Sequence, residues 1–253
     1  EYDVTAQLHR VTNCMVLWLG PGWFPVTDPN ERMLFPELIH DGPLVRAEVV
    51  VQTDSREPLV VGTDESWKTA ASHLTPLGQC SHGNFGGERF DARTVINGWA
   101  DPGFDAAMWE NAASITVPQH EVAVYEGPPN RVIQSWEPKA VTPFEDAEQG
   151  GWLFDVGREF TGWLEIDFGS AYEEGREFVL EYSDRPPGDQ FNQYRQWDEY
   201  VCSGNGEEWF CNRFNYHAFR WATVRGCDKP PKRLQAKFIA ADMPQTGFFK
   251  CPD

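Results

Sequence analysis

The residues best suited to binding a ligand stand together at 83–93, in the stretch GNFGGERFDAR. Amide and carboxylate oxygens are the ligands that Ca²⁺ prefers, and the hydroxyl groups of a sugar can complete its coordination shell. The three glycines suit equally well an ordinary loop that leads into a strand. These residues alone leave two interpretations open: a loop that holds calcium or a sugar, and a loop that serves only as scaffold.

Two tryptophans after this loop, Trp99 and Trp109, are candidates for carbohydrate binding. Aromatic faces can stack on the C–H faces of a sugar ring, but large amphipathic rings are more often buried. A core role therefore stays open as the alternative for both. Glu88, Asp91 and Arg93 are predicted to form a salt-bridged entry into a strand.

Four further positions are predicted to be structural. Asp64 and Trp67 in GTDESWKT have the pattern of a turn and a strand start. Arg220 is predicted to form an internal ion pair. His217 is predicted to be a hydrogen-bonded neighbour of the same strand, because no second histidine or cysteine lies at metal-binding spacing.

No catalytic residue is predicted in this chain. Glycoside hydrolysis needs two carboxylates about 5 to 9.5 Å apart, and the surroundings of the 39 acidic residues distinguish no such pair. The sequence also lacks a Gly-x-Ser-x-Gly motif and a phosphate-binding or dinucleotide-binding loop.

The net charge of −18 excludes two classes of partner. Nucleic-acid binding depends on basic side chains that neutralise phosphates, and an anionic membrane surface repels an acidic chain. No apolar run approaches the roughly 18 residues of a membrane span.

The six cysteines show no zinc-binding spacing. Cys202 and Cys211 flank Asn205-Gly206, a dipeptide typical of a two-residue hairpin turn. Adjacent strands would bring the two thiols within bridging distance, so we predict a disulfide and an oxidising, extracellular compartment. The remaining pairings stay open, and domain membership alone suggests Cys14–Cys80 and Cys227–Cys251.

The pattern along the chain predicts an all-β fold. Residues 44–53 and 58–63 are β-branched runs, and residues 162–169 alternate apolar and acidic side chains as a half-buried strand does. One or two helical turns are expected only at 101–113. Two prolines at 128–129 mark the best boundary, which predicts domains at 1–127 and 128–253.

Several motifs resemble, in the same order and over essentially the whole chain, the accessory β-domains of α-L-rhamnosidases. They are EYDVTAQL, RAEVVVQT, VVGTDESWKTA, GGERFDAR, PPNRVIQSWEP, FDVGREFTGWLEI and RFNYHAFRWATVRG. The resemblance implies two antiparallel, jelly-roll-like β-sandwiches, the first related to a calcium-dependent L-rhamnose-binding module. It also implies that the first sandwich lacks its N-terminal strands and that the catalytic α/α toroid lies outside this sequence.

The resemblance implies a role for Asn84 as a ligand of calcium and of the sugar. Family members that bind rhamnose carry an Asp-Asn pair here, whereas this chain has Gly83-Asn84. Loss of the anionic ligand should weaken a calcium site. The structural alternative is that Asn84 occupies a left-handed turn before the glycines.

Three functions follow as hypotheses. The chain is the non-catalytic β-sandwich portion of a secreted α-L-rhamnosidase, supporting its catalytic domain and binding rhamnose-terminated glycans. Alternatively, it is a stand-alone, lectin-like rhamnose-binding module, or a structural protein that reuses the fold.

Overall fold

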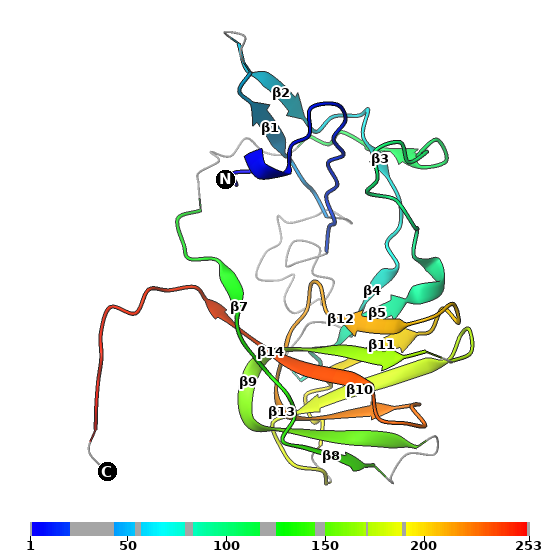
Figure 1. Ribbon diagram of the computed structural model, residues 1–253, viewed down its shortest axis with the longest axis vertical. Helices are drawn as coiled ribbons and strands as arrows, with labels where there is room; N and C mark the ends of the chain where they lie inside the picture. The colour runs from blue at the N-terminus through cyan, green and yellow to red at the C-terminus, as the bar shows by residue number, and fades with distance from the viewer. Residues whose placement is uncertain are drawn as a thin grey trace. The chain divides into compact units, whose positions relative to one another are not determined.

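The computed structural model describes residues 2–20, 43–53, 57–78, 83–116, 125–144, 150–170, 172–188 and 191–251. Strands dominate these residues (Figure 1), and the helices among them are the short 3₁₀ turns η1 (Thr5–Gln7) and η2 (Ala92–Thr94). The all-β prediction is confirmed.

The helical turns predicted at 101–113 are wrong. This stretch forms hydrogen-bonded turns, with Phe104 N–H donating to Asp101 O and Trp109 N–H donating to Ala106 O. Gly103 has a φ of 102°, outside the helical range, and its conformational freedom favours a turn over a helix here.

The chain divides into two compact units. The first comprises Glu1–His73 and Val95–Val124, and the second comprises Leu74–Thr94 and Tyr125–Asp253. The domain ranges 1–127 and 128–253 stay a prediction. They assign Leu74–Thr94 to the first domain, whereas this segment makes its contacts within the second unit.

The first unit contains two small antiparallel sheets. β1 (Glu48–Val51) pairs with β2 (Leu59–Gly62), within the two predicted β-branched runs. β3 (Lys68–Thr69) pairs with β6 (Glu110–Asn111).

The second unit is built on one large sheet in the order β4-β5-β11-β10-β13-β9-β14-β7, with β8 and β12 paired to β9. All of these pairs are antiparallel except the parallel pair of β5 and β11. The strands are β4 (Leu74–Leu77), β5 (Gly87–Asp91), β7 (Asn130–Trp136), β8 (Ala140–Pro143), β9 (Gly151–Gly169), β10 (Glu177–Ser183), β11 (Trp197–Val201), β12 (Glu208–Cys211), β13 (His217–Arg225) and β14 (Arg233–Ala241).

The long strand β9 folds this sheet around its core. Residues 151–155 pair with β8, residues 162–169 pair with β14 and β12, and β13 pairs with both 151–155 and 160–162. Between them, Gly157 has a φ of 82° and allows the bend that Figure 1 shows.

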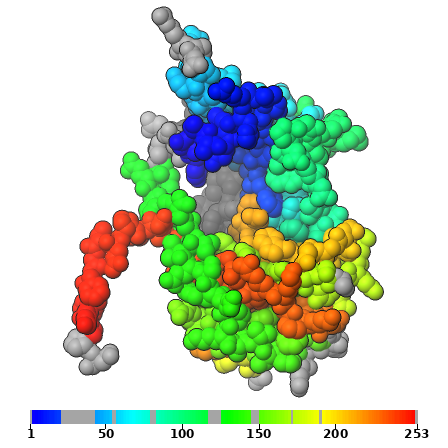
Figure 2. Space-filling model, in the orientation of Figure 1, coloured from blue at the N-terminus to red at the C-terminus, as the bar shows by residue number. Residues whose placement is uncertain are grey.

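The core lies inside this curled sheet. The alternation predicted at 162–169 is confirmed, because Leu164, Ile166 and Phe168 are buried while the residues between them are partly exposed. Their neighbours include Phe154, Phe178, Leu180, Phe210, Phe219 and Val224. After β14, a tail drawn in red in Figure 2 carries the exposed side chains Met243, Phe248 and Phe249.

The predicted Cys202–Cys211 disulfide is absent, and both cysteines are buried free thiols. The hairpin on which the prediction depended is wrong. β11, which precedes the Asn205-Gly206 turn, pairs with β10 and β5, whereas β12, which follows it, pairs with β9. The turn therefore connects separate parts of the curled sheet. Cys14 and Cys227 are also free thiols, and Cys80 lies outside the described residues.

Candidate functional site

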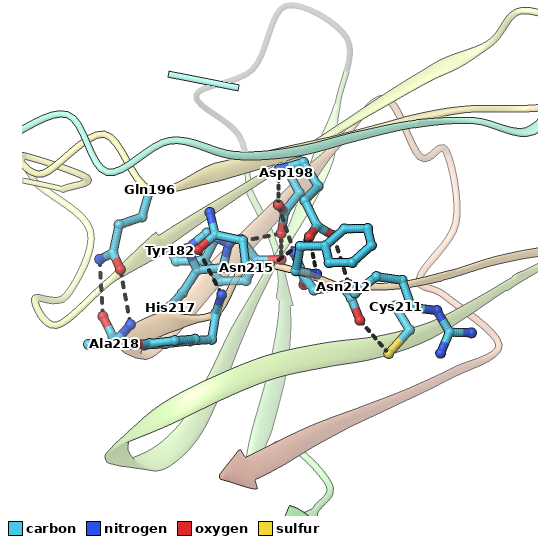
Figure 3. Close-up of polar contacts among 12 residues, drawn as sticks. Tyr182, Gln196, Asp198, Cys211, Asn212, Asn215, His217 and Ala218 are labelled. Atoms are coloured by element: carbon cyan, nitrogen blue, oxygen red, sulfur yellow. Dashed lines mark hydrogen bonds and ion pairs between the residues drawn. The ribbon is translucent and has the colours of Figure 1, made fainter. Parts of the chain in front are cut away.

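A buried carboxylate, Asp198 on β11, joins four segments of the second unit (Figure 3). Its Oδ1 accepts hydrogen bonds from the Glu88 backbone N–H at 2.8 Å and from Asn212 Nδ2 at 2.9 Å. Its Oδ2 accepts from the Tyr182 hydroxyl at 2.6 Å and lies 3.0 Å from His217 Nε2. Because a carboxylate accepts only, His217 carries a proton on Nε2 in this arrangement.

Strand register explains why these side chains meet. Leu180 on β10 pairs with Asp198 on β11, so Asp198 projects to the same apolar face as Tyr182 and Tyr200. The His217 ring stacks on the Tyr182 ring with centroids 4.1 Å apart. A buried charge without partners would be strongly destabilising, and the four contacts to Asp198 offset that desolvation.

Glu88 on β5 extends the cluster to the segment that follows β12. Its carboxylate accepts the successive backbone N–H groups of Arg213, Phe214 and Asn215. Burial raises the pKa of Glu88 above its ordinary value; the N–H groups oppose this shift, and the nearby charge of Asp198 adds to it. Glu88 therefore holds the segment 212–216 against β5. Among the described residues, Glu88 has no ion-pair partner, so the salt bridge predicted for it from the sequence is not found there.

The cluster is closed to solvent, which limits its chemistry. Asp198 and Tyr182 are 0% exposed, His217 is 2% exposed and Glu88 is 3% exposed. Burial, followed by the charge of Asp198, raises the pKa of Tyr182 well above its ordinary value, so the phenol stays a donor. These groups position the surrounding loops, since a substrate could reach none of them.

Asn84 lies just before this cluster, in the second unit, and is half-buried. Gly83 and Gly86 have positive φ angles of 77° and 65°, whereas Asn84 does not. The left-handed turn proposed as its structural alternative therefore belongs to the two glycines. A Cβ at Gly86 would lie 1.9 Å from the Leu77 carbonyl oxygen, so this position requires glycine.

Calcium fits this loop poorly. Residues 83–87 contain no carboxylate, and Glu88, the nearest one, already accepts three backbone N–H groups. Across the described ranges, no group of three or more His, Cys, Asp or Glu side chains could hold a metal ion.

The two candidate tryptophans lie in the first unit, whereas Asn84 lies in the second. The Trp99 ring meets the Trp18 ring edge-on at 6.3 Å, and Trp109 packs against Phe104 at 5.3 Å. Trp109 also lines a cavity of about 380 Å³ with Thr69, Ala70, Ala71, Met108 and Glu110. Each tryptophan thus has an aromatic packing partner, and Trp109 also lines this cavity.

Two of the predicted ion pairs are present. Arg93 makes a bidentate contact with Asp91 at 2.9 and 2.7 Å. Arg220 makes another with Asp155 at 2.9 and 3.0 Å, as its predicted internal pair.

The other structural predictions are confirmed. His217 is a hydrogen-bonded strand residue, as its contact with Asp198 shows. Asp64 Oδ1 accepts the Ser66 N–H at 2.7 Å in a turn, and Trp67 immediately precedes β3.

Sequence reasoning missed Asp198, Tyr182 and Asn212. A signal was present in WDEYV. Asp198 lies two residues before Tyr200 and so points to the same face of the strand, where the period-2 pattern predicts an apolar side chain. An acid on the inner face of a strand indicates a buried polar cluster.

Family models match the chain in two consecutive stretches. Residues 1–134 match the α-L-rhamnosidase N-terminal domain, and residues 145–241 match the bacterial α-L-rhamnosidase concanavalin-like domain. The first match alone covers more than half of the chain. The chain belongs to the α-L-rhamnosidase family.

Relatives in this family are much longer. An α-L-rhamnosidase of Formosa agariphila is 25% identical over 100% of this chain and 27% of its own length, and one of Streptomyces avermitilis is 27% identical over 91% and 22%. The solved α-L-rhamnosidase of Dictyoglumus thermophilum has a TM-score of 0.69 at 27% identity, covering 80% of this chain and 23% of that one. The chain thus spans about a quarter of the length of the relatives it matches. Within the part of the chain that the structure describes, no helix is long and apolar enough to cross a membrane.

Proposed function

We propose that this chain is the non-catalytic β-sandwich portion of an α-L-rhamnosidase. It supports the catalytic domain of the same polypeptide and binds rhamnose-terminated glycans weakly. The observation that carries the proposal is the succession of two rhamnosidase accessory domains over about a quarter of the length of the relatives. Secretion stays a prediction, and the absence of the Cys202–Cys211 bridge removes one argument for it.

The most deeply buried carboxylates favour a supporting role over catalysis. A glycosidase needs two carboxyl groups that face the scissile bond. Asp198, Glu208 and Glu88 are enclosed, and hydrogen-bond donors within the chain contact their oxygens.

Sugar binding is proposed at Asn84, with the Trp109 cavity as the second location to test. The assignment of Asn84 depends on the resemblance of its loop to the family motif. Trp109 is the second candidate because its aromatic ring lines the cavity beside a carboxylate, Glu110. A monosaccharide buries little surface, so we expect a Kd from millimolar to high micromolar, about −4 to −6 kcal/mol.

Two measurements on the 253-residue chain test the proposal. The purified chain should not hydrolyse an aryl α-L-rhamnoside. Calorimetric titration should detect L-rhamnose at tens of millimolar, with Asn84→Ala or Trp109→Ala reporting which position binds it. Turnover abolished by one Asp or Glu substitution would overturn the non-catalytic assignment, and absence of heat in the titration would overturn the binding role.

A further inference from the structure

The Asn205-Gly206 dipeptide lies in the segment that joins β11 to β12, and the proposed function makes no use of it. Asparagine is a labile residue, and a following glycine makes it more so, because glycine has no side chain to shield its backbone nitrogen from the neighbouring carboxamide. The chain contains one other such pair, Asn97-Gly98. Both pairs are exposed, so accessibility alone does not distinguish them.

The segment around Asn205 is anchored on one side and unconfined on the other. The buried Glu208 carboxylate accepts the Ser203 N–H at 3.1 Å and the Gly204 N–H at 2.9 Å, which fixes the chain before Asn205. Gly206 has a φ of 133°, and no atom lies within 4 Å of a Cβ built there. Among the described residues, no group accepts a hydrogen bond from the Gly206 N–H. Rotation that brings the Gly206 nitrogen onto the Asn205 side chain therefore displaces no packed neighbour and breaks no hydrogen bond of Gly206.

A lysine compensates the acidic side chain next to this pair. Lys232 Nζ lies 3.2 and 3.1 Å from the two carboxylate oxygens of Glu207, and it also lies 3.4 Å from Asp167 Oδ2. Attack on Asn205 requires the Gly206 N–H to lose its proton, and a neighbouring negative charge opposes that ionisation. The Lys232 ammonium offsets the charge of Glu207, so the surroundings of this pair favour the attacking anion.

The Asn97-Gly98 pair has the opposite surroundings. It lies in a turn in which the Gly98 carbonyl accepts the Asp101 N–H at 2.9 Å. Asp101 Oδ2 lies 3.1 Å from a Cβ built at Gly98, and within the described ranges no basic side chain pairs with Asp101. This carboxylate opposes ionisation of the Gly98 N–H, and the turn restricts rotation of Gly98.

We propose that Asn205 is a site of spontaneous deamidation in the folded chain and that it reacts faster than Asn97. The Gly206 nitrogen attacks Cγ of Asn205, and the bond between Cγ and the carboxamide nitrogen breaks. Ammonia leaves with the proton of the Gly206 amide, and a cyclic succinimide remains. Water then opens the ring at either carbonyl, which gives aspartate or isoaspartate and adds a negative charge. The reaction needs only water, and the inference is independent of the proposed function.

Peptide mapping by mass spectrometry tests the proposal on the purified chain, incubated at one mildly alkaline pH in water enriched in heavy oxygen. Product formed during the incubation carries a heavy oxygen, and isoaspartate should accompany aspartate because the ring intermediate yields both. The rate at each site is divided by the rate of the same site in denaturant, which removes the effect of the flanking sequence. This ratio should be at least about twofold larger for Asn205 than for Asn97, the scale of one screened charge a few ångströms away.

Charge variants separate the effect of the structure from the lability of the dipeptide. Lys232→Gln removes the compensating ammonium and should slow the reaction of Asn205 about twofold without changing Asn97. Asp101→Asn should accelerate the reaction of Asn97 and leave Asn205 unchanged. Lys229→Gln removes an exposed lysine that has no ion-pair partner among the described residues, and this matched control should react as the wild type does.

Asn205→Gln should end the reaction at this position, because the longer side chain forms a cyclic imide much more slowly. The variants change exposed side chains, and near-UV circular dichroism checks that each one folds. The proposal is overturned if folded Asn205 stays intact while the denatured chain reacts, or if Asn97 reaches the same ratio as Asn205. An unchanged rate in Lys232→Gln would also overturn it, since the dipeptide would then react without help from its surroundings.

Discussion

The Tyr182 hydroxyl donates a 2.6 Å hydrogen bond to Asp198 Oδ2, although neither side chain reaches solvent. Removing either partner leaves a buried polar group unsatisfied. We predict that Asp198→Ala lowers the free energy of unfolding by about 3 kcal/mol and that Tyr182→Phe lowers it by about 1–2 kcal/mol. Urea denaturation measures both. Asp242→Ala removes only an exposed pair with Arg131, and its unfolding should match the wild type. Equal effects of the three substitutions would contradict this interpretation.

Glu88 should give the protein an unusual pH dependence. Its pKa is raised above the ordinary value of 4.5, so the folded state holds this proton more tightly than the unfolded state does. The contribution of Glu88 to stability is therefore largest below pH 4.5 and is lost as the pH rises through the raised pKa. The difference in unfolding free energy between wild type and Glu88→Gln should decrease as the pH rises through this window.

The stability contribution of Asp155 should have the opposite pH dependence and serves as a control. Its hydrogen bonds from Arg220 lower its pKa below the ordinary value of 3.8. The stability that it contributes is present above pH 3.8 and is lost as the pH falls through the lowered pKa. The difference between wild type and Asp155→Asn should therefore increase with pH, and slopes of the same sign for both pairs would rule out the assignment.

Thiol labelling tests the cysteine assignment. Burial raises the pKa of Cys202 to about 12 and that of Cys211 to about 11, and both thiols are enclosed. We predict that a thiol reagent labels Cys14 in the folded protein and labels Cys202 and Cys211 only after denaturation without reductant. A peptide map that recovers Cys202 joined to Cys211 would contradict the structure.

Calcium should change the binding of L-rhamnose by less than about twofold, because residues 83–87 offer no carboxylate. Gly83→Asp restores an acid at the position where the resemblance places one. No atom lies within 4 Å of a Cβ built at Gly83, and aspartate tolerates the left-handed conformation better than most residues. The variant should therefore fold and bind more tightly in calcium than in chelator. Calorimetry decides the point, and a strong chelator effect on the wild type would show that the calcium prediction is wrong.

The sequence predicted local features well and long-range pairing poorly. The alternation at 162–169 identified the buried face of β9 because side-chain direction in a strand depends only on neighbouring residues. Asn205-Gly206 lies in a bend at 204–206 and not in the predicted hairpin turn, because the strands on either side of it pair with other strands of the curled sheet. Asp198 was missed because its partners come from residues up to 110 positions away.

The parallel pairing of β5 with β11 brings an upstream strand into the second unit, so this unit is discontinuous in the amino-acid sequence. Arg89 on β5 pairs with Glu199 on β11 and forms ion pairs with Glu199 and Glu177. A shortened chain that starts at residue 128 would lack this strand, expose the edge of β11 and take one N–H donor from Asp198. Recombination at the proline boundary would therefore separate β11 from its partner strand β5. The segment after residue 128 is not an independent module, because its sheet needs a strand from the preceding part of the chain.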